Sequence, residues 1–224
     1  SGEVINAFRR EVVELQDGRR VRKTYSNTNT APWPYAAEHF KDFVFSRKAA
    51  EWLRGPRRRP FALFVCLWAP HPPLRAPEPY FSMFGPARLD LPANVGVAAT
   101  GEPRNRRLGM PAQMAEGVSA EQWRRVWSAH LGLVRLADEA LGSILDALRD
   151  SGREAETVVA FTVDHGEQLG QHAMYQKMEM YEPAVRVPLV VRAPGAAARS
   201  FEQVVSHLDV MPTLLELMGL PVPG

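Results

Sequence analysis

The stretch "FTVDHGEQLGQHAMYQK", Phe161 to Lys177, decides how this sequence is interpreted. It begins inside the apolar run "TVVAFTV", residues 157–163, which predicts a buried β-strand. Asp164, His165 and a glycine follow where that strand should end, and a second histidine and a lysine follow closely. A carboxylate and an imidazole side by side at a strand end can both bind a divalent cation without a long loop to position them.

Length and composition restrict the class of protein. The chain has 224 residues, 46% of them apolar, which is enough for one domain with a hydrophobic core. The formal charge is only +2, and the arginine clusters at 54–60 and 102–107 contain no interleaved aromatic residues, so we expect no nucleic-acid partner. No apolar stretch approaches the roughly 18 to 20 residues of a membrane span, so we expect no membrane partner either. The N-terminus "SGEVINAFRR" has no apolar signal core, which slightly favours a cytoplasmic location.

Local patterns predict an alternation of helices and apolar strands. The expected elements are a hairpin over 11–25 around Asp17-Gly18, a helix over 36–53, a strand over 60–70, an irregular segment over 74–118, a helix over 119–152, strands over 157–163 and 186–194, and a helix over 209–218 with Pro212 in its first turn. The run "PFALFVCLWAP" (60–70) is apolar at every position, so it should be covered on both faces, with Cys66 as a small buried residue. We therefore expect a single α/β domain over 1–224, with a mainly parallel sheet sandwiched by helices.

The polar residues that follow two of these strands suggest one site. Ligands gather at the carboxyl ends of parallel strands, and His71 follows one strand as Asp164 and His165 follow another. Lys177 beside a divalent cation needs an anion between the two positive charges, so the set describes a pocket for a tetrahedral oxyanion. The alternatives are that Asp164 caps a helix, that His165 bonds a buried carbonyl and that Lys177 lies in solvent.

At this point the sequence resembles a known family. The succession "TVVAFTVDHGEQLGQHAMYQKMEMYEPAVRVPLVVRAPG" (157–195) closely resembles the sulfatase family of the alkaline phosphatase superfamily. The segments "PFALFVCLWAPHPP" (60–73) and "SHLDVMPTLLELMGLPVPG" (206–224) agree in the same order along the chain. The resemblance implies an alkaline-phosphatase-like fold.

The resemblance also implies roles for individual residues. Asp164 and His165 would be two ligands of one divalent metal, Ca²⁺ as in sulfatases or Mn²⁺ as in related phosphonate monoester hydrolases. His71 and Lys177 would contact the sulfate oxygens, and one of them would help the leaving oxygen depart. His172 lies at a position that is often histidine in the family and is assigned to substrate binding. His207 is expected to cap a helix or support packing.

One part of the family pattern is missing. A Cys-x-Pro-x-Arg or Ser-x-Pro-x-Arg element, whose Cys or Ser becomes the formylglycine nucleophile, does not occur in this sequence. Cys66 is followed by Leu-Trp-Ala-Pro, and Thr28 and Thr30 are better explained as turn residues than as nucleophiles. We therefore expect the chain to be the central and C-terminal part of a sulfatase-like domain, without the nucleophile strand and without the family's small C-terminal subdomain. Such a chain alone should bind metal weakly and turn over little.

Three functions are consistent with these residues. The first is metal-dependent hydrolysis of small-molecule sulfate monoesters, with this chain supplying half of the metal site. Hydrolysis of phosphonate monoesters or phosphodiesters is the nearest alternative, because the same pocket suits either tetrahedral centre. The remaining possibilities are a non-catalytic binding module and a metal-dependent transferase of a phosphoryl-type group.

Overall fold

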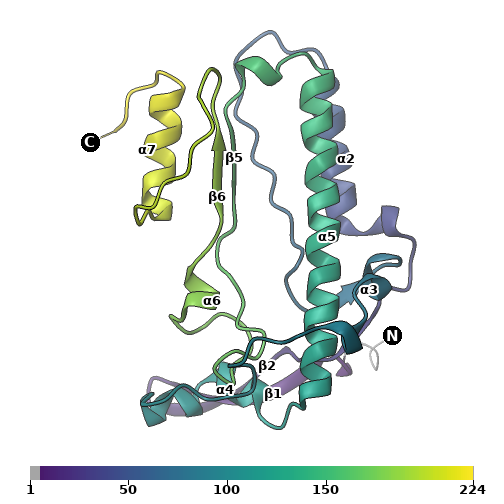
Figure 1. The fold of residues 1–224 in the computed structure, drawn as a ribbon, viewed down its shortest axis with the longest axis vertical. Coiled ribbons are helices and arrows are strands. Elements are labelled where there is room, and N and C mark those ends of the chain that lie inside the picture. Colours follow the sequence, from purple (N-terminus) through teal and green to yellow (C-terminus); the bar gives the residue numbers. More distant parts are fainter. Residues whose placement is uncertain (1–5, 224) are drawn as a thin grey trace.

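The computed structural model describes residues 6–223. Figure 1 shows its arrangement around one long helix, α5, with α2 beside it and the β5–β6 pair and α7 on the other side. The elements are β1 (Arg9–Gln16), β2 (Arg19–Ser26), β3 (Thr30–Pro32), η1 (Ala37–His39), α2 (Lys41–Arg54), β4 (Leu74–Ala76), α3 (Tyr80–Met83), η2 (Pro86–Arg88), η3 (Arg104–Leu108), α4 (Met110–Ala115), α5 (Ala120–Asp150), η4 (Glu154–Glu156), β5 (Val159–Thr162), α6 (Glu182–Val185), β6 (Leu189–Arg192) and α7 (His207–Leu217). None of the described helices is long and apolar enough to cross a membrane.

The predicted hairpin is confirmed. Strands β1 and β2 pair antiparallel, with Gln16 opposite Arg19. The two loop residues, Asp17 and Gly18, have φ values of 51° and 75°. Positive φ at both central positions defines the turn type that matches the twist of two-residue hairpins, and Asp-Gly supplies it at low cost. The hairpin is attached to α4 because the Gln113 side chain bonds the backbone N–H and C=O of Val13.

The predicted long helix is also confirmed and carries most of the core. The Ser119 side chain accepts a hydrogen bond from the backbone N–H of Gln122, 3.1 Å away, so the helix begins where the capping pattern predicts. Its inner face is fully buried, with Trp123, Val126, Ala129, Leu133 and Leu136 packed against Leu74 and Tyr175. This core holds α2, α3 and β4 against α5.

The prediction of a β-strand over residues 60–70, covered on both faces, is wrong for the part of the chain that the structure describes. The segment is extended but has no strand partner. Phe61 and Val65 pack against the buried face of α2 and α5, whereas Phe64 on the opposite face is 76% exposed. Cys66 is also exposed, so its predicted burial is wrong. An extended chain turns alternate side chains to opposite faces, and here helices cover only one face.

The expected mainly parallel sheet is likewise not found within residues 6–223. The described strands form three separate two-stranded sheets. The β5–β6 and β1–β2 pairs are antiparallel, and only the short β3–β4 pair is parallel. The β5–β6 pair has exposed apolar residues on its surface, Phe161, Leu189, Val190 and Val191. The predicted alternation of helices and strands is present, but the strands are not joined into one sheet.

The predicted closing helix is confirmed with shifted bounds. Ser206 and Asp209 form a complete capping box at the start of α7. The helix therefore begins earlier than expected, and Pro212 lies inside it rather than in its first turn. The region from 74 to 118 contains only short helices and one short strand, as its composition predicts.

Candidate active site

The turn after β5 places Asp164 and His165 by means of a glycine. The backbone N–H of Gly166 donates to the carbonyl of Ala184 at 2.7 Å, and that of Glu167 donates to Pro183 at 2.9 Å. A Cβ atom at position 166 would collide with the carbonyl oxygen of Pro183. Only glycine allows this close approach, so the Asp-His-Gly order fixes the turn against the backbone of α6.

The geometry of His165 leaves one ring nitrogen available. Its Nδ1 lies 2.8 Å from the carbonyl oxygen of Gly166, and a carbonyl only accepts, so Nδ1 carries the proton. In the neutral ring Nε2 then holds a lone pair, 3.4 Å from Oδ2 of Asp164. The Asp164 side chain is 86% exposed, and its Oδ1 accepts a hydrogen bond from the backbone N–H of His165 at 3.0 Å, so Oδ2 is the oxygen open to a ligand. An imidazole with its other nitrogen bonded to a backbone carbonyl is the usual arrangement of a metal-binding histidine.

These two side chains fit half of a metal site. No group of three or more His, Cys, Asp or Glu side chains that could hold a metal ion occurs within residues 6–223. Asp164 and His165 offer one carboxylate and one imidazole, whereas hard divalent cations take six or more ligands. The donor types suit the expected cation, and further oxygen ligands would have to come from elsewhere.

His71 is held by a buried carboxylate from α2. Asp42 is completely buried, and its Oδ1 accepts hydrogen bonds from the backbone N–H groups of Trp68 and Ala69 at 2.5 and 2.9 Å. The N–H of His71 then donates to the carbonyl of Trp68 at 2.9 Å. Through these bonds the first turn of α2 fixes the end of the extended segment and the imidazole that follows it.

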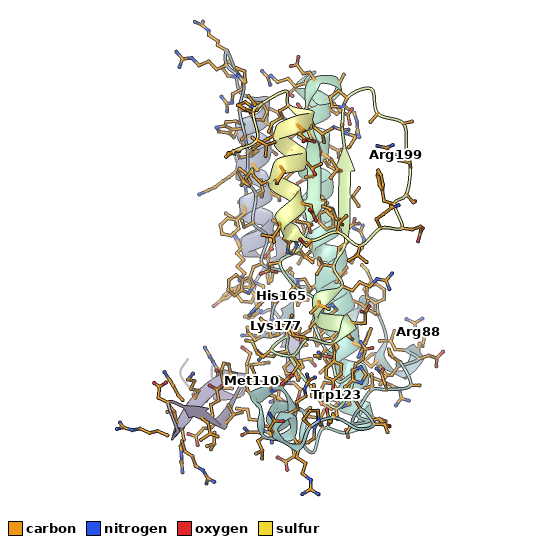
Figure 2. All side chains as sticks on the ribbon, turned by 90° about the vertical axis from the view of Figure 1, so that its left-hand side faces the viewer. Arg88, Met110, Trp123, His165, Lys177 and Arg199 are labelled. Carbon is orange, nitrogen blue, oxygen red and sulfur yellow. The ribbon has the colours of Figure 1, made fainter. Side chains whose placement is uncertain are left out.

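His71 and Lys177 are in direct contact. The Nδ1 of His71 lies 2.7 Å from the carbonyl of Pro72, so it is protonated and Nε2 is the acceptor. Lys177 Nζ lies 2.7 Å from that Nε2 and donates to it, although the two residues are 106 positions apart in the chain. Figure 2 shows His165 and Lys177 at the same level of the molecule. The structure thus brings together His71 and Lys177, two of the residues that the sequence assigned to one oxyanion pocket.

Positive charge is concentrated around His71. Burial is the main cause that lowers the pKa of its imidazole, and the charges of Lys177, His165 and Lys41 lower it further, against the opposing effect of the Pro72 carbonyl. Burial also raises the pKa of Glu167 to about 7, opposed by the charge of Lys177. A region in which positive groups disfavour one another is suited to a bound anion.

The structure places the other two histidines in different contacts. His172 has a φ of 57°, its ring stacks on Tyr181 at 4.3 Å, and its Nε2 lies 3.4 Å from the Asn94 side chain. These contacts fasten the loop after Gly170 to the segment before η3. His207 Nε2 lies 3.3 Å from the Thr162 hydroxyl at the end of β5, which agrees with a supporting role.

Sequence reasoning missed Asp42 and Lys41. An acidic residue in the first turn of a helix is ordinarily explained by its favourable interaction with the helix dipole. The sequence therefore gives no reason to connect Asp42 with the backbone of a turn 26 residues later. Lys41 is one of two lysines on the helix predicted over 36–53. No sequence signal distinguishes it.

Comparison with known proteins identifies the family of the chain. The family described as Sulfatase matches residues 10–220. The multifunctional alkaline phosphatase superfamily protein PehA of Trinickia caryophylli is 31% identical over 203 residues, covering 83% of this chain and 40% of that protein. An arylsulfatase of Clostridium perfringens is 29% identical over 199 residues, covering 86% and 41%. The chain thus spans about two fifths of the length of these relatives.

Solved structures show the same fold. The phosphonate monoester hydrolase of Agrobacterium radiobacter superposes with a TM-score of 0.72 at 28% identity, covering 87% of this chain and 42% of that one. A protein solved with its substrate D-glucosamine-2-N,6-O-disulfate has a TM-score of 0.72 at 19% identity, a likeness of fold alone. Since the family match covers nearly the whole chain, this protein belongs to the sulfatase family of the alkaline phosphatase superfamily.

Proposed function

We propose that this chain takes part in the hydrolysis of small-molecule sulfate monoesters, supplying half of a metal site and the pair that binds the sulfate oxygens. The observation that carries the proposal is the 2.7 Å contact between Lys177 Nζ and His71 Nε2, with His165 and Lys41 adding positive charge nearby. Within the described residues, Lys177 has no carboxylate at ion-pair distance, so its charge is available to a substrate. Belonging to the sulfatase family supports a sulfate ester as that substrate.

In the proposed reaction Lys177 donates N–H groups to the oxygens of the sulfate, and its ammonium stabilises the charge that develops there. The bound anion offsets the positive charges that lower the pKa of His71, so the imidazole can take up a proton at Nε2. When a nucleophile from outside these residues forms its bond to sulfur, the S–O bond to the alcohol breaks and its electrons remain on the alcohol oxygen, which receives the proton from the pair. His172 is proposed to act on substrate only indirectly, through the loop that it holds.

Asp164 and His165 would hold a divalent cation, Ca²⁺ in the first place and Mn²⁺ as the alternative. When bound, such an ion polarises the ester oxygens. The formylglycine nucleophile is expected in a segment outside these residues, together with the remaining ligands. In this proposal residues 1–224 form the central and C-terminal part of one sulfatase-like domain.

A second candidate is the hydrolysis of phosphonate monoesters or phosphodiesters. Two phosphonate monoester hydrolases, from Silicibacter pomeroyi and Agrobacterium radiobacter, match with TM-scores of 0.69 and 0.72 at 27% and 28% identity. The pair of Lys177 and His71 would serve a phosphorus centre equally, because its oxygens have the same tetrahedral arrangement.

The test combines binding and turnover. The esters phenyl sulfate and phenyl phenylphosphonate are titrated into the 224-residue chain while the NMR signals of His71 are followed. Hydrolysis of 4-nitrophenyl sulfate, 4-nitrophenyl phosphate and 4-nitrophenyl phenylphosphonate is then tested with Ca²⁺ or Mn²⁺. We expect anion binding that weakens at least tenfold in Lys177→Ala and persists in Lys48→Ala, an exposed lysine of α2.

Two results would contradict the proposal. Anion binding that is equal in Lys177→Ala and in the unchanged chain would remove the oxyanion role. Hydrolysis by the chain alone that disappears in Asp164→Ala would place the nucleophile within these residues. The ester that binds more tightly decides between the sulfate and the phosphonate alternatives.

A further inference from the structure

A second feature lies beside the proposed oxyanion pair. Lys41, the first residue of α2, places its Nζ 3.8 Å from the ring centroid of Trp68. The Trp68 ring is in turn 4.7 Å from the His71 ring, with a tilt of 54° between their planes. A continuous row of Lys41, Trp68, His71 and Lys177 therefore runs along one side of the site.

Among the described residues, no carboxylate forms an ion pair with Lys41. Its neighbour Asp42 is completely buried and directed at the backbone of Trp68 and Ala69. Within residues 6–223 Lys41 makes no ion pair at 4 Å or less, and its recorded partner is the face of Trp68. A cation on an exposed aromatic face is stabilised only weakly, so its charge can still attract an anion.

Trp68 offers a surface for the part of the substrate that carries the ester. Its side chain is half exposed although it is a large aromatic residue. A flat ring or a sugar can pack on such a surface while its ester group reaches His71 and Lys177. The ammonium of Lys41 then lies at the far edge of that surface.

We propose that Lys41 and Trp68 form a subsite for the leaving alcohol, and that this subsite selects alcohols that carry a second anionic group, a carboxylate or another sulfate. The inference rests on the proposed function, because it places the first anionic group on His71 and Lys177. Lys41 is a specificity residue here, since it touches the substrate away from the bond that breaks.

The experiment uses three esters with the unchanged chain, Lys41→Gln and Lys48→Gln. Phenyl sulfate carries one negative charge, 4-(sulfooxy)benzoate adds a carboxylate, and 1,4-phenylene disulfate adds a second sulfate. We expect the unchanged chain to bind the two dianions about fivefold more tightly than phenyl sulfate, as for a solvent-exposed ion pair. Lys41→Gln should remove this preference, so that the three esters bind to this variant with similar affinity. Lys48→Gln should retain it.

A second measurement tests the position of Lys41 without any ester. The pKa of His71, followed by NMR, should rise in Lys41→Gln and stay unchanged in Lys48→Gln, because one of the charges that lower it is removed. Failure to bind any of the three esters would overturn the proposed function as a whole. Binding of phenyl sulfate with no preference for dianions, or a preference that survives in Lys41→Gln, would overturn the subsite alone. The tighter of the two dianions identifies the preferred second group.

Discussion

Among single residues, Asp42 controls the position of His71 without touching it. Replacing it in Asp42→Ala leaves two buried backbone N–H groups without an acceptor, each of which costs roughly 1 to 3 kcal/mol. We expect the free energy of unfolding to fall by about 2 to 4 kcal/mol in urea denaturation, and the NMR signals of His71 to shift. Asp42→Asn keeps one oxygen acceptor and should lose less than half as much. Equal losses in both variants would argue against the hydrogen bonds as the cause.

His130 on α5 should make stability depend on pH. Its Nδ1 is shielded from water without a partner among the described residues, and burial lowers the pKa of the ring to about 4. Between pH 6.5 and 4 the unfolded chain takes up a proton that the folded chain does not, so stability is present above pH 6.5 and falls as the pH decreases. The expected loss is about 2 to 3 kcal/mol by pH 4.

The measurement is denaturant unfolding at pH 7, 5.5 and 4. His130→Gln should flatten this part of the pH dependence, whereas His39→Gln, at an exposed position, should leave it unchanged. A pH dependence that is identical in all three proteins would exclude His130 as its source.

Among the individual residues of the site, the contact between His71 and Lys177 was predictable, because both follow recognisable segments of one family pattern. The roles of the neighbouring residues Asp42 and Lys41 could not be predicted from the sequence. Asp42 and Lys41 act through the packing of α2 against the turn at residues 68–71, which depends on tertiary structure. Burial of Cys66 was predicted from apolar neighbours and is wrong, since its face of the segment has no cover.

Among the elements, α5 offers a comparison between two glycines. A Cβ at Gly132 would collide with the backbone carbonyl of Tyr80, so α3 packs directly on the helix there. Nothing lies within 4 Å of a Cβ at Gly142. We expect Gly142→Ala to raise the free energy of unfolding by about 0.5 to 1 kcal/mol, because alanine is the better helix former. Gly132→Ala should lower it by roughly 1 to 3 kcal/mol through overpacking.

Urea denaturation of the two variants at one pH checks this pair. The same substitution in the same helix should change stability in opposite directions. Stabilisation by Gly132→Ala would mean that α3 moves away from α5 easily.

Elements with local signals were predicted well, and elements that depend on a partner were not. Ser119 begins α5, and Asp17-Gly18 fixes the hairpin register, because each signal lies within a few residues of its effect. The apolar run at residues 60–70 indicated a strand. A strand must pair with a second segment, however, and the residues of the run do not show which segment that is or whether it is present. The same reason explains why an expected parallel sheet is replaced by three small ones.

For the molecule as a whole, large apolar side chains are exposed on three elements near α5. Phe64, Trp68, Val190, Leu208 and Met211 are all at least half exposed, and they lie on the extended segment, β6 and α7. Figure 1 shows these elements to one side of α5. Exposed apolar area of this kind favours association. We expect the isolated chain to self-associate at micromolar concentration.

Sedimentation velocity measures this association. Phe64→Lys should shift the distribution towards the monomer. Leu15→Lys replaces an equally exposed residue on the hairpin and should have little effect. If both variants behave like the unchanged chain, the face around Phe64 is not the cause.

The uncovered extended segment over residues 60–70 affects how readily proteases degrade the chain. Proteases bind exposed chain segments, and this segment is already extended without a strand partner among the described residues. The exposed Arg58 and Arg59 stand at its beginning, so a trypsin-like enzyme should cut first between them. Any polypeptide that covers the segment would shield this bond. The rate of tryptic cleavage after Arg58 therefore reports whether the segment is covered.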